Sequence, residues 1–85
     1  MRYEIYLSEE FFKRISKFSE KLKVDILNKI KEMEDKPKGK RLHGFNLYTL
    51  RIGKYRIIYK IDHSERKIYI VTIAHRKNIY DRYLK

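Results

Sequence analysis

A two-residue turn, Gly53-Lys54, separates two stretches that both have the composition of β-strands, residues 47–52 and residues 55–62. Glycine at the first central position of a two-residue loop favours a type II′ turn, one of the two tight turns that match the twist of a β-hairpin. A hairpin of this kind fixes the register of both strands. No other short segment of the chain constrains the fold as strongly.

The turn predicts that Ile52 pairs with Tyr55, that Arg51 pairs with Arg56 and that Leu47 pairs with Lys60. Two guanidinium groups then face each other, and like charges so placed destabilise a sheet by several tenths of a kcal/mol to about 1 kcal/mol. An anion bound between them removes the conflict, and arginine suits phosphate. We therefore predict a phosphate site here. The alternative is that both arginines are ordinary surface residues that extend into solvent.

The rest of the chain predicts an α+β domain with the order β-α-α-β-β-β-α. Residues 2–7 alternate as a strand, and residues 9–35 carry apolar residues at helical spacing, as two helices or one helix bent near Ser19. Residues 36–46 form a basic loop, residues 67–74 a β-branched strand and residues 76–85 a short helix. We expect a small antiparallel sheet, joined by the first strand, with the two N-terminal helices packed on one face.

The register of the last strand is predicted from its apolar residues. If the apolar faces coincide, Ile61 pairs with Lys67, Tyr59 with Tyr69, and Ile57 with Val71, whereas a slip of one residue reverses the faces. The face of Arg56 then also carries Ile68, Ile70, Thr72, Ala74 and Arg76, with Arg76 opposite Ile52. The cationic residues expected on this face are Arg51, Arg56, Lys60 and Arg76, with Lys54 at its edge and Tyr80 able to swing over it.

The net charge of +11 over 85 residues lies entirely in the second part of the chain. Residues 1–35 hold eight basic and eight acidic side chains, and residues 36–85 hold fourteen basic and three acidic ones. Such a concentrated excess favours a nucleic-acid surface, with a membrane surface or an acidic protein as the other candidate partner. The residues expected to contact RNA are Lys38, Lys40, Arg41, Lys54, Lys60 and Lys77.

Composition excludes several classes of protein. A chain of 85 residues with 42% apolar residues fits one domain, residues 1–85, with one core. It has no cysteine and its three histidines are scattered, so we expect no disulfide, metal or other cofactor. No apolar run has the length of a membrane span, so we expect a cytoplasmic protein without a membrane partner. Abundant Lys and Glu with no Gln suit a thermophile.

Three segments together resemble the RelE/ParE superfamily of toxins from toxin–antitoxin systems. They are Leu42-His43-Gly44, residues 48–59 with the sequence YTLRIGKYRIIY, and Ala74-His75-Arg76 followed by Ile79-Tyr80. They follow the family's L-x-G, Y-x-x-R-x-G-x-Y-R-hydrophobic-hydrophobic-Y and G-H-R-x-x-x-Y pattern in order. Two positions depart from it: Thr49 stands where well-studied members have a second basic residue, and Ala74 stands where glycine is usual.

The resemblance implies a RelE-like fold and an endoribonuclease that cuts mRNA in the ribosomal A site. In such enzymes the 2′-hydroxyl attacks the adjacent phosphate without a metal. By resemblance, Arg56 stabilises the transition state and Arg76 assists the leaving group or binds phosphate. Arg51 matches a basic position on the preceding strand, and Tyr80 orients or stacks on the nucleotide. Thr49 leaves open which group accepts the 2′-hydroxyl proton.

The resemblance also implies a partner. A RelB-like antitoxin is expected to wrap the toxin in a heteromeric complex, shield the basic face and displace the tail helix. The ribosome and mRNA are the other expected partners. Two further functions stay open: a ParE-like inhibitor of DNA gyrase, and a non-catalytic module that binds RNA or the ribosome.

Overall fold

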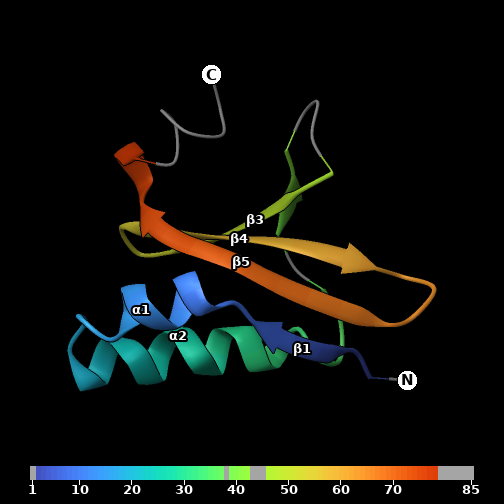
Figure 1. Ribbon diagram of the computed structural model, residues 1–85, viewed down its shortest axis with the longest axis horizontal. Helices are drawn as coiled ribbons and strands as arrows, with labels where there is room; N and C mark the ends of the chain where they lie inside the picture. The colour runs from blue at the N-terminus through green and yellow to red at the C-terminus, as the bar shows by residue number, and fades with distance from the viewer. Residues whose placement is uncertain (1, 38, 43–45, 79–85) are drawn as a thin grey trace.

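The computed structural model describes residues 2–37, 39–42 and 46–78 of the chain. A five-stranded sheet lies over two helices, α1 (Glu9–Ile15) and α2 (Glu20–Glu32), so this α+β fold has two layers (Figure 1). The strands are β1 (Glu4–Leu7), β2 (Lys40–Arg41), β3 (Tyr48–Ile52), β4 (Tyr55–Asp62) and β5 (Lys67–His75). Their order across the sheet is β1-β5-β4-β3-β2.

Each helix begins at a serine that caps it. The Ser8 hydroxyl accepts a hydrogen bond from the backbone N–H of Phe11 at 3.1 Å, and the Ser19 hydroxyl accepts one from Leu22 at 3.2 Å. A cap of this type stabilises a helix by about 1 kcal/mol. The second cap explains why the region forms two helices and not one bent helix, the alternative that the sequence left open.

The two helices bury one face of the sheet, as predicted. Phe11, Ile26 and Met33 from the helices have no exposed surface. They belong to the same apolar cluster as Ile57 and Tyr59 on β4, which are also fully buried. Strand alternation therefore sends every second residue of β4 into the core and the residues between them to the opposite face.

The hairpin formed by β3 and β4 has the predicted register. Arg51 pairs with Arg56, Ile52 pairs with Tyr55, and Gly53 has a φ of +55°, as the first central residue of a type II′ turn requires. The strand begins at Tyr48, one residue later than expected, so the predicted pair of Leu47 with Lys60 does not form part of the ladder.

The predicted register of β5 is wrong because the strand contains a β-bulge. Ile58 pairs with Thr72 but the next residue, Tyr59, pairs with Ile70, so Val71 is an extra residue without a partner in the β4 ladder. Ile57 pairs with Ile73, two residues beyond the predicted Val71. Near the turn the error is one residue: Tyr59 does not pair with Tyr69, and Ile61 pairs with Ile68 in place of Lys67.

The bulge changes which side chains share a face. Ile68 and Ile70 are buried in the core on the helix side, not on the face of Arg56 as predicted. Thr72 and Ala74 lie on the face of Arg56, as predicted, because they follow the bulge. An inserted residue reverses the alternation of the strand, so one register cannot hold for both ends of β5.

Three further features complete the sheet. β1 runs parallel to β5, from Glu4 beside Lys67 to Leu7 beside Ile70, so the sheet is mixed and not wholly antiparallel. The basic loop contributes β2, which pairs with β3 at the sheet edge and was not predicted. Residues 76–78 are helical, where the start of the C-terminal helix was predicted, and the remaining residues of that prediction, 79–85, lie outside the described residues.

Candidate active site

The face of the sheet opposite the helices carries the predicted arginine pair. Arg51 and Arg56 are directly opposite each other, which places their Cβ atoms about 4.5–5.5 Å apart. Arg51 is exposed, and Arg56 is half-buried with its Nε shielded from solvent. The predicted pairing of Arg51 with Arg56 is therefore confirmed.

We call this surface the open face and define it by the residues that strand pairing brings into rows across the sheet. The rows are Arg51, Arg56 and Ala74; then Lys40, Thr49, Ile58 and Thr72; then Lys60, Tyr69 and Tyr6; then Asp62, Lys67 and Glu4. The first three rows contain four cationic side chains and no acidic one. The open face thus has its positive charge toward the Gly53-Lys54 end and mixed charge at the other end.

A small apolar cluster lies beside the arginine pair. Ile58 and Leu42 are buried there, and Leu47, Val71 and Ala74 pack against them. This cluster excludes water from part of the surface next to Arg56. Electrostatic interactions are stronger near a low-dielectric surface than in bulk water, so an anion bound at Arg56 is held more firmly than at a fully solvated arginine.

The third predicted arginine reaches the same end of the sheet by a backbone hydrogen bond. The N–H of Arg76 donates to the carbonyl oxygen of Lys54 at 2.9 Å. Arg76 is therefore beside the hairpin turn and not opposite Ile52 as predicted, because the bulge shifts the end of β5 by two positions along β4. Arg76 and Lys54 are both exposed.

The other predicted RNA contacts are spread over the sheet. Lys40, Arg41, Lys60 and Lys77 are all exposed. Lys60 is four residues from Arg56 on β4, which corresponds to about 13 Å along the strand. Lys38 and Tyr80 lie outside the described residues, as do His43 and Gly44 of the family pattern.

The Thr49 hydroxyl is not accessible to a substrate on the open face. This residue is 6% exposed, and its hydroxyl is buried without a hydrogen-bond partner among the described residues. A buried hydroxyl cannot exchange protons with a substrate at the surface. The exposed Lys40 is paired directly with Thr49, so a basic side chain lies next to this threonine on the neighbouring strand.

The acidic group on the open face nearest to Lys60 is already engaged. Asp62 accepts hydrogen bonds from the backbone N–H of Glu65 at 3.0 Å and from the Ser64 hydroxyl at 2.8 Å. These bonds, first that of Glu65 and then that of Ser64, lower the pKa of the Asp62 carboxyl below its usual value. Asp62 therefore stays ionised and is unsuited to donate a proton. Among the described residues there is no group of three acidic or histidine side chains that could hold a metal ion.

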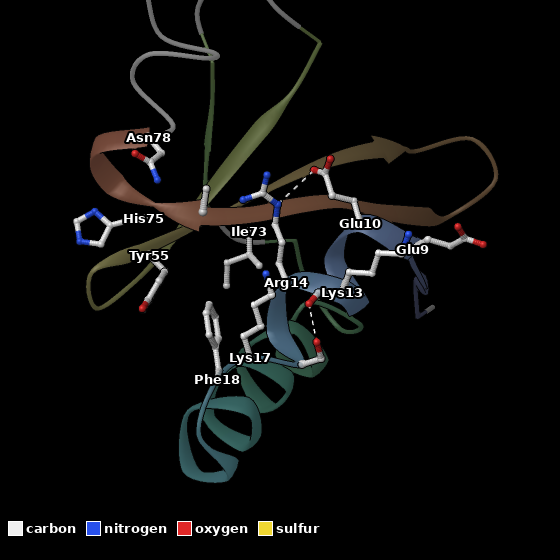
Figure 2. Close-up of a pocket in the computed structure, with 12 residues that line it drawn as sticks. Glu9, Glu10, Lys13, Arg14, Lys17, Phe18, Tyr55, Ile73, His75 and Asn78 are labelled. Atoms are coloured by element: carbon white, nitrogen blue, oxygen red, sulfur yellow. Dashed lines mark hydrogen bonds and ion pairs between the residues drawn. The ribbon is translucent and has the colours of Figure 1, made fainter.

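A second concave region was not predicted from the sequence. A cleft of about 960 Å³ lies between α1 and the last residues of β5, on the side of the helices (Figure 2). The Tyr55 ring packs against Phe18 and stands edge-on to His75, and Arg14 is paired with Glu10 at 3.8 Å. The cleft combines acidic and basic side chains and does not include the arginine pair. It forms where β5 continues beyond the end of β1, a feature that the sequence pattern did not indicate.

The described helices are too short and too polar for any of them to span a membrane.

Several solved structures share this fold. A mutant of the Escherichia coli toxin RelE in the free state matches with a TM-score of 0.79 at 15% identity, over 99% of this chain and 96% of that one. The archaeal RelE–RelB complex from Pyrococcus horikoshii matches at 0.76 and 21% identity, over 89% and 97% of the two chains. The RelB–RelE antitoxin–toxin complex from Methanococcus jannaschii matches at 0.73 and 24% identity, over 92% and 98%. The architecture is therefore that of the small RelE-like toxins, as predicted.

A family model described as the ParE toxin of the type II toxin–antitoxin system parDE matches residues 7–80. This range includes the arginine pair and all of β3, β4 and β5. The chain thus belongs to the ParE toxin family, within the RelE/ParE superfamily, and is the toxin of a type II toxin–antitoxin system. Its RelE-like fold is compatible with endoribonuclease activity. No curated protein sequence matches the chain.

Proposed function

We propose that this toxin is an mRNA interferase, a ribosome-dependent endoribonuclease that cleaves mRNA in the A site and so inhibits translation. The observation that supports the proposal most directly is the pairing of Arg51 with Arg56 on the open face. Like charges so placed oppose folding, and an anion that binds between the two guanidinium groups would remove the conflict. A phosphate of an RNA backbone is an anion of this kind.

In the proposed reaction the 2′-hydroxyl of one nucleotide attacks the adjacent phosphorus, and the bond to the 5′-oxygen of the next nucleotide breaks. Negative charge develops on the phosphate oxygens, and Arg56, half-buried beside the apolar cluster, donates to them. Arg51 approaches from the neighbouring strand. Arg76, held at the turn through Lys54, binds phosphate or assists the leaving oxygen. Tyr80 remains the predicted nucleotide contact.

We further propose that Lys40 supplies the basic side chain that Thr49 does not. Lys40 is exposed, pairs with Thr49 on the open face and lies in the row next to the arginine pair. Replacing Lys40 with alanine is expected to lower cleavage, whereas Thr49→Val, which removes only a buried hydroxyl, is expected to leave it unchanged. Equal effects of the two substitutions would contradict this assignment.

The main test is Arg56→Ala in an assay of purified toxin with ribosomes and mRNA. We expect the rate of cleavage to fall by about 10²-fold or more, the scale observed when one donor to a developing oxyanion is removed. Arg2→Ala is the matched control, because Arg2 is an exposed arginine that pairs with Glu34 and Asp35 away from the open face. Full activity of the Arg56 variant would rule out the proposed site.

Inhibition of DNA gyrase is the second candidate function, and the ParE description of the matching family model favours it. ParE-type members usually lack the basic set that the open face presents, which supports RNA cleavage instead. A gyrase supercoiling assay separates the two functions. Inhibition of supercoiling without ribosome-dependent mRNA cuts would establish the gyrase inhibitor. Intact RNA with salt-sensitive binding would indicate a non-catalytic RNA-binding module.

A RelB-like antitoxin is the proposed protein partner. Among the solved structures with this fold, those from P. horikoshii and M. jannaschii are complexes of RelE with RelB. The exposed cations Arg51, Lys54 and Lys60 offer a surface for an acidic segment of such a partner. An antitoxin bound there would cover the arginine pair and block access of RNA.

A further inference from the structure

Two tyrosines form an exposed, stacked pair at the end of the open face away from the arginines. Tyr6 on β1 and Tyr69 on β5 are register partners. Their ring centroids are 5.3 Å apart and their planes differ by 19°. Tyr6 is 41% exposed and Tyr69 is 39% exposed, although aromatic rings of this size are usually more buried. The pair is held in a fixed arrangement and is open to solvent.

Contacts with neighbouring side chains fix the position of the Tyr6 ring. The Tyr6 hydroxyl donates a hydrogen bond to the Glu4 carboxylate at 2.8 Å, and Lys67 Nζ lies 5.8 Å from the centroid of the Tyr6 ring. On the other side, the exposed Lys60 is the register partner of Tyr69. Lysines therefore flank the two rings. The acidic groups Glu4 and Asp62 lie in the last row of the open face, away from the arginine pair.

A second cleft lies beside the same residues. It has a volume of about 430 Å³, and its lining includes Lys60 and Tyr69 together with the Asp62 carboxylate and polar groups of Asn46, His63 and Ser64. Amide, imidazole and hydroxyl groups of this kind can hydrogen-bond to the edges of a nucleobase. An aromatic surface, a cation and polar groups thus meet at one place, beside a carboxylate that is already hydrogen-bonded to Ser64 and Glu65.

We propose that Tyr6 and Tyr69 form a platform on which bases of single-stranded RNA stack, with Lys60 and Lys67 contacting the adjacent phosphates. Proteins that bind single strands without sequence preference combine stacking aromatic rings with a basic track along the backbone. Here Lys60 and Arg56 are about 13 Å apart along β4, so one RNA strand can reach both the platform and the arginine pair. The inference rests on the proposed function, because it places a further part of the same RNA substrate on the open face.

The test measures binding of a short single-stranded RNA whose 2′-hydroxyls are methylated, so that it cannot be cleaved by 2′-hydroxyl attack. We compare the wild-type toxin with the Tyr6→Leu/Tyr69→Leu variant, which loses the aromatic rings, and the Tyr6→Phe/Tyr69→Phe variant, which keeps them. The leucine variant is expected to bind about 5- to 100-fold more weakly, and the phenylalanine variant nearly as tightly as the wild type. Thermal unfolding of both variants checks that they are folded.

A matched RNA with the same sugar-phosphate backbone but with abasic sites separates stacking from charge. It should bind the wild type and the leucine variant equally, because neither can stack a base against it. Tight binding of intact RNA by the leucine variant would overturn the platform. The platform would also be overturned if the leucine variant lost as much affinity for abasic RNA as it loses for intact RNA.

These binding experiments, together with the ribosome-dependent cleavage assay of the wild type, distinguish failure of the platform from failure of the proposed function. If the wild type does not cut mRNA on ribosomes but binds RNA through its bases and tyrosines, the platform stands and the enzymatic function fails. If the wild type cuts mRNA and the leucine variant binds RNA unchanged, the function stands and the platform fails.

Discussion

The two faces of the sheet are built from the same strands but differ in burial and in charge. On the face covered by α1 and α2, Ile57 and Tyr59 are fully buried in one continuous core. On the open face, Arg56 of the same strand is half-buried and Lys60 is exposed. The comparison shows that the covered face holds the fold together, so the open face can keep a pair of like charges that does not favour folding.

The open face is not uniformly polar, and this refines the comparison. Ile58, next to Ile57 in sequence, is also fully buried, but its cluster contains one other buried residue, Leu42. A small apolar cluster stabilises a fold less than a continuous core. Its position beside Arg56 indicates that it also shapes the surroundings of the arginine pair.

The largest effect on stability should come from Ile57→Ala, with Ile58→Ala as its neighbour on the other face. Removing a buried isoleucine side chain costs about 2–5 kcal/mol in the free energy of unfolding. We expect Ile57→Ala near the upper end, because the main core surrounds it, and Ile58→Ala near the lower end, because its smaller cluster can relax. Urea unfolding measures both values. A greater loss for Ile58→Ala would reverse our view of which face carries the stability.

A decrease in stability of intermediate size is expected at high pH, because the Tyr59 hydroxyl is buried. Burial, with a smaller contribution from Tyr48, raises the pKa of the Tyr59 hydroxyl from 10.0 to about 12. The folded state then holds the proton more tightly than the unfolded state. The contribution to stability is complete below pH 10 and is lost as pH rises toward 12, by about 2–3 kcal/mol for a shift of two pKa units.

The matched control for this prediction is Tyr59→Phe. Phenylalanine does not titrate, and it removes a buried hydroxyl that has no hydrogen-bond partner among the described residues. We expect the variant to be more stable by about 1 kcal/mol at neutral pH and to lose less stability between pH 10 and 12. Thermal unfolding across this range gives both quantities, and parallel curves for the two proteins would argue against a titration of Tyr59.

The smallest effect should come from the arginine pair itself. Arg51→Gln removes one of two facing charges, so we expect it to increase stability by up to about 1 kcal/mol at low salt while it lowers cleavage. The gain should shrink as salt rises, because screening weakens repulsion between exposed charges. Lys54→Gln, a change in the neighbouring turn that leaves the pair intact, should give no such gain. Loss of stability in Arg51→Gln at low salt would show that the pair does not oppose folding.

Local signals in the sequence predicted the hairpin and the helical region, and left open whether that region is two helices or one bent helix. Gly53 requires a backbone conformation that few other residues adopt readily, and serines at both helix starts supply caps, so short segments determined these elements. The pairing of Arg51 with Arg56 followed directly from the turn. This is why the centre of the candidate site was predictable.

Long-range packing decided what the sequence did not predict. Residues 68–74 are rich in apolar residues on both sides of the strand, so alternation alone does not show where Val71 bulges out. The stacked pair of Tyr6 and Tyr69 depends on the parallel pairing of β1 with β5, which no local pattern indicates. The register of β5 and the aromatic end of the open face therefore needed the structure.

The pairing of β1 with β5 also bears on when the toxin becomes active during its synthesis. Residues 4–7 leave the ribosome early, but their partners in the sheet are residues 67–70, and Arg76 follows later still. Contacts so distant in sequence form late and slow the folding of a domain. A nascent chain that has emerged only to Asp62 should remain sensitive to protease, whereas one that has emerged beyond Asn78 should resist it. The toxin should thus become active only after nearly the whole chain has been synthesised.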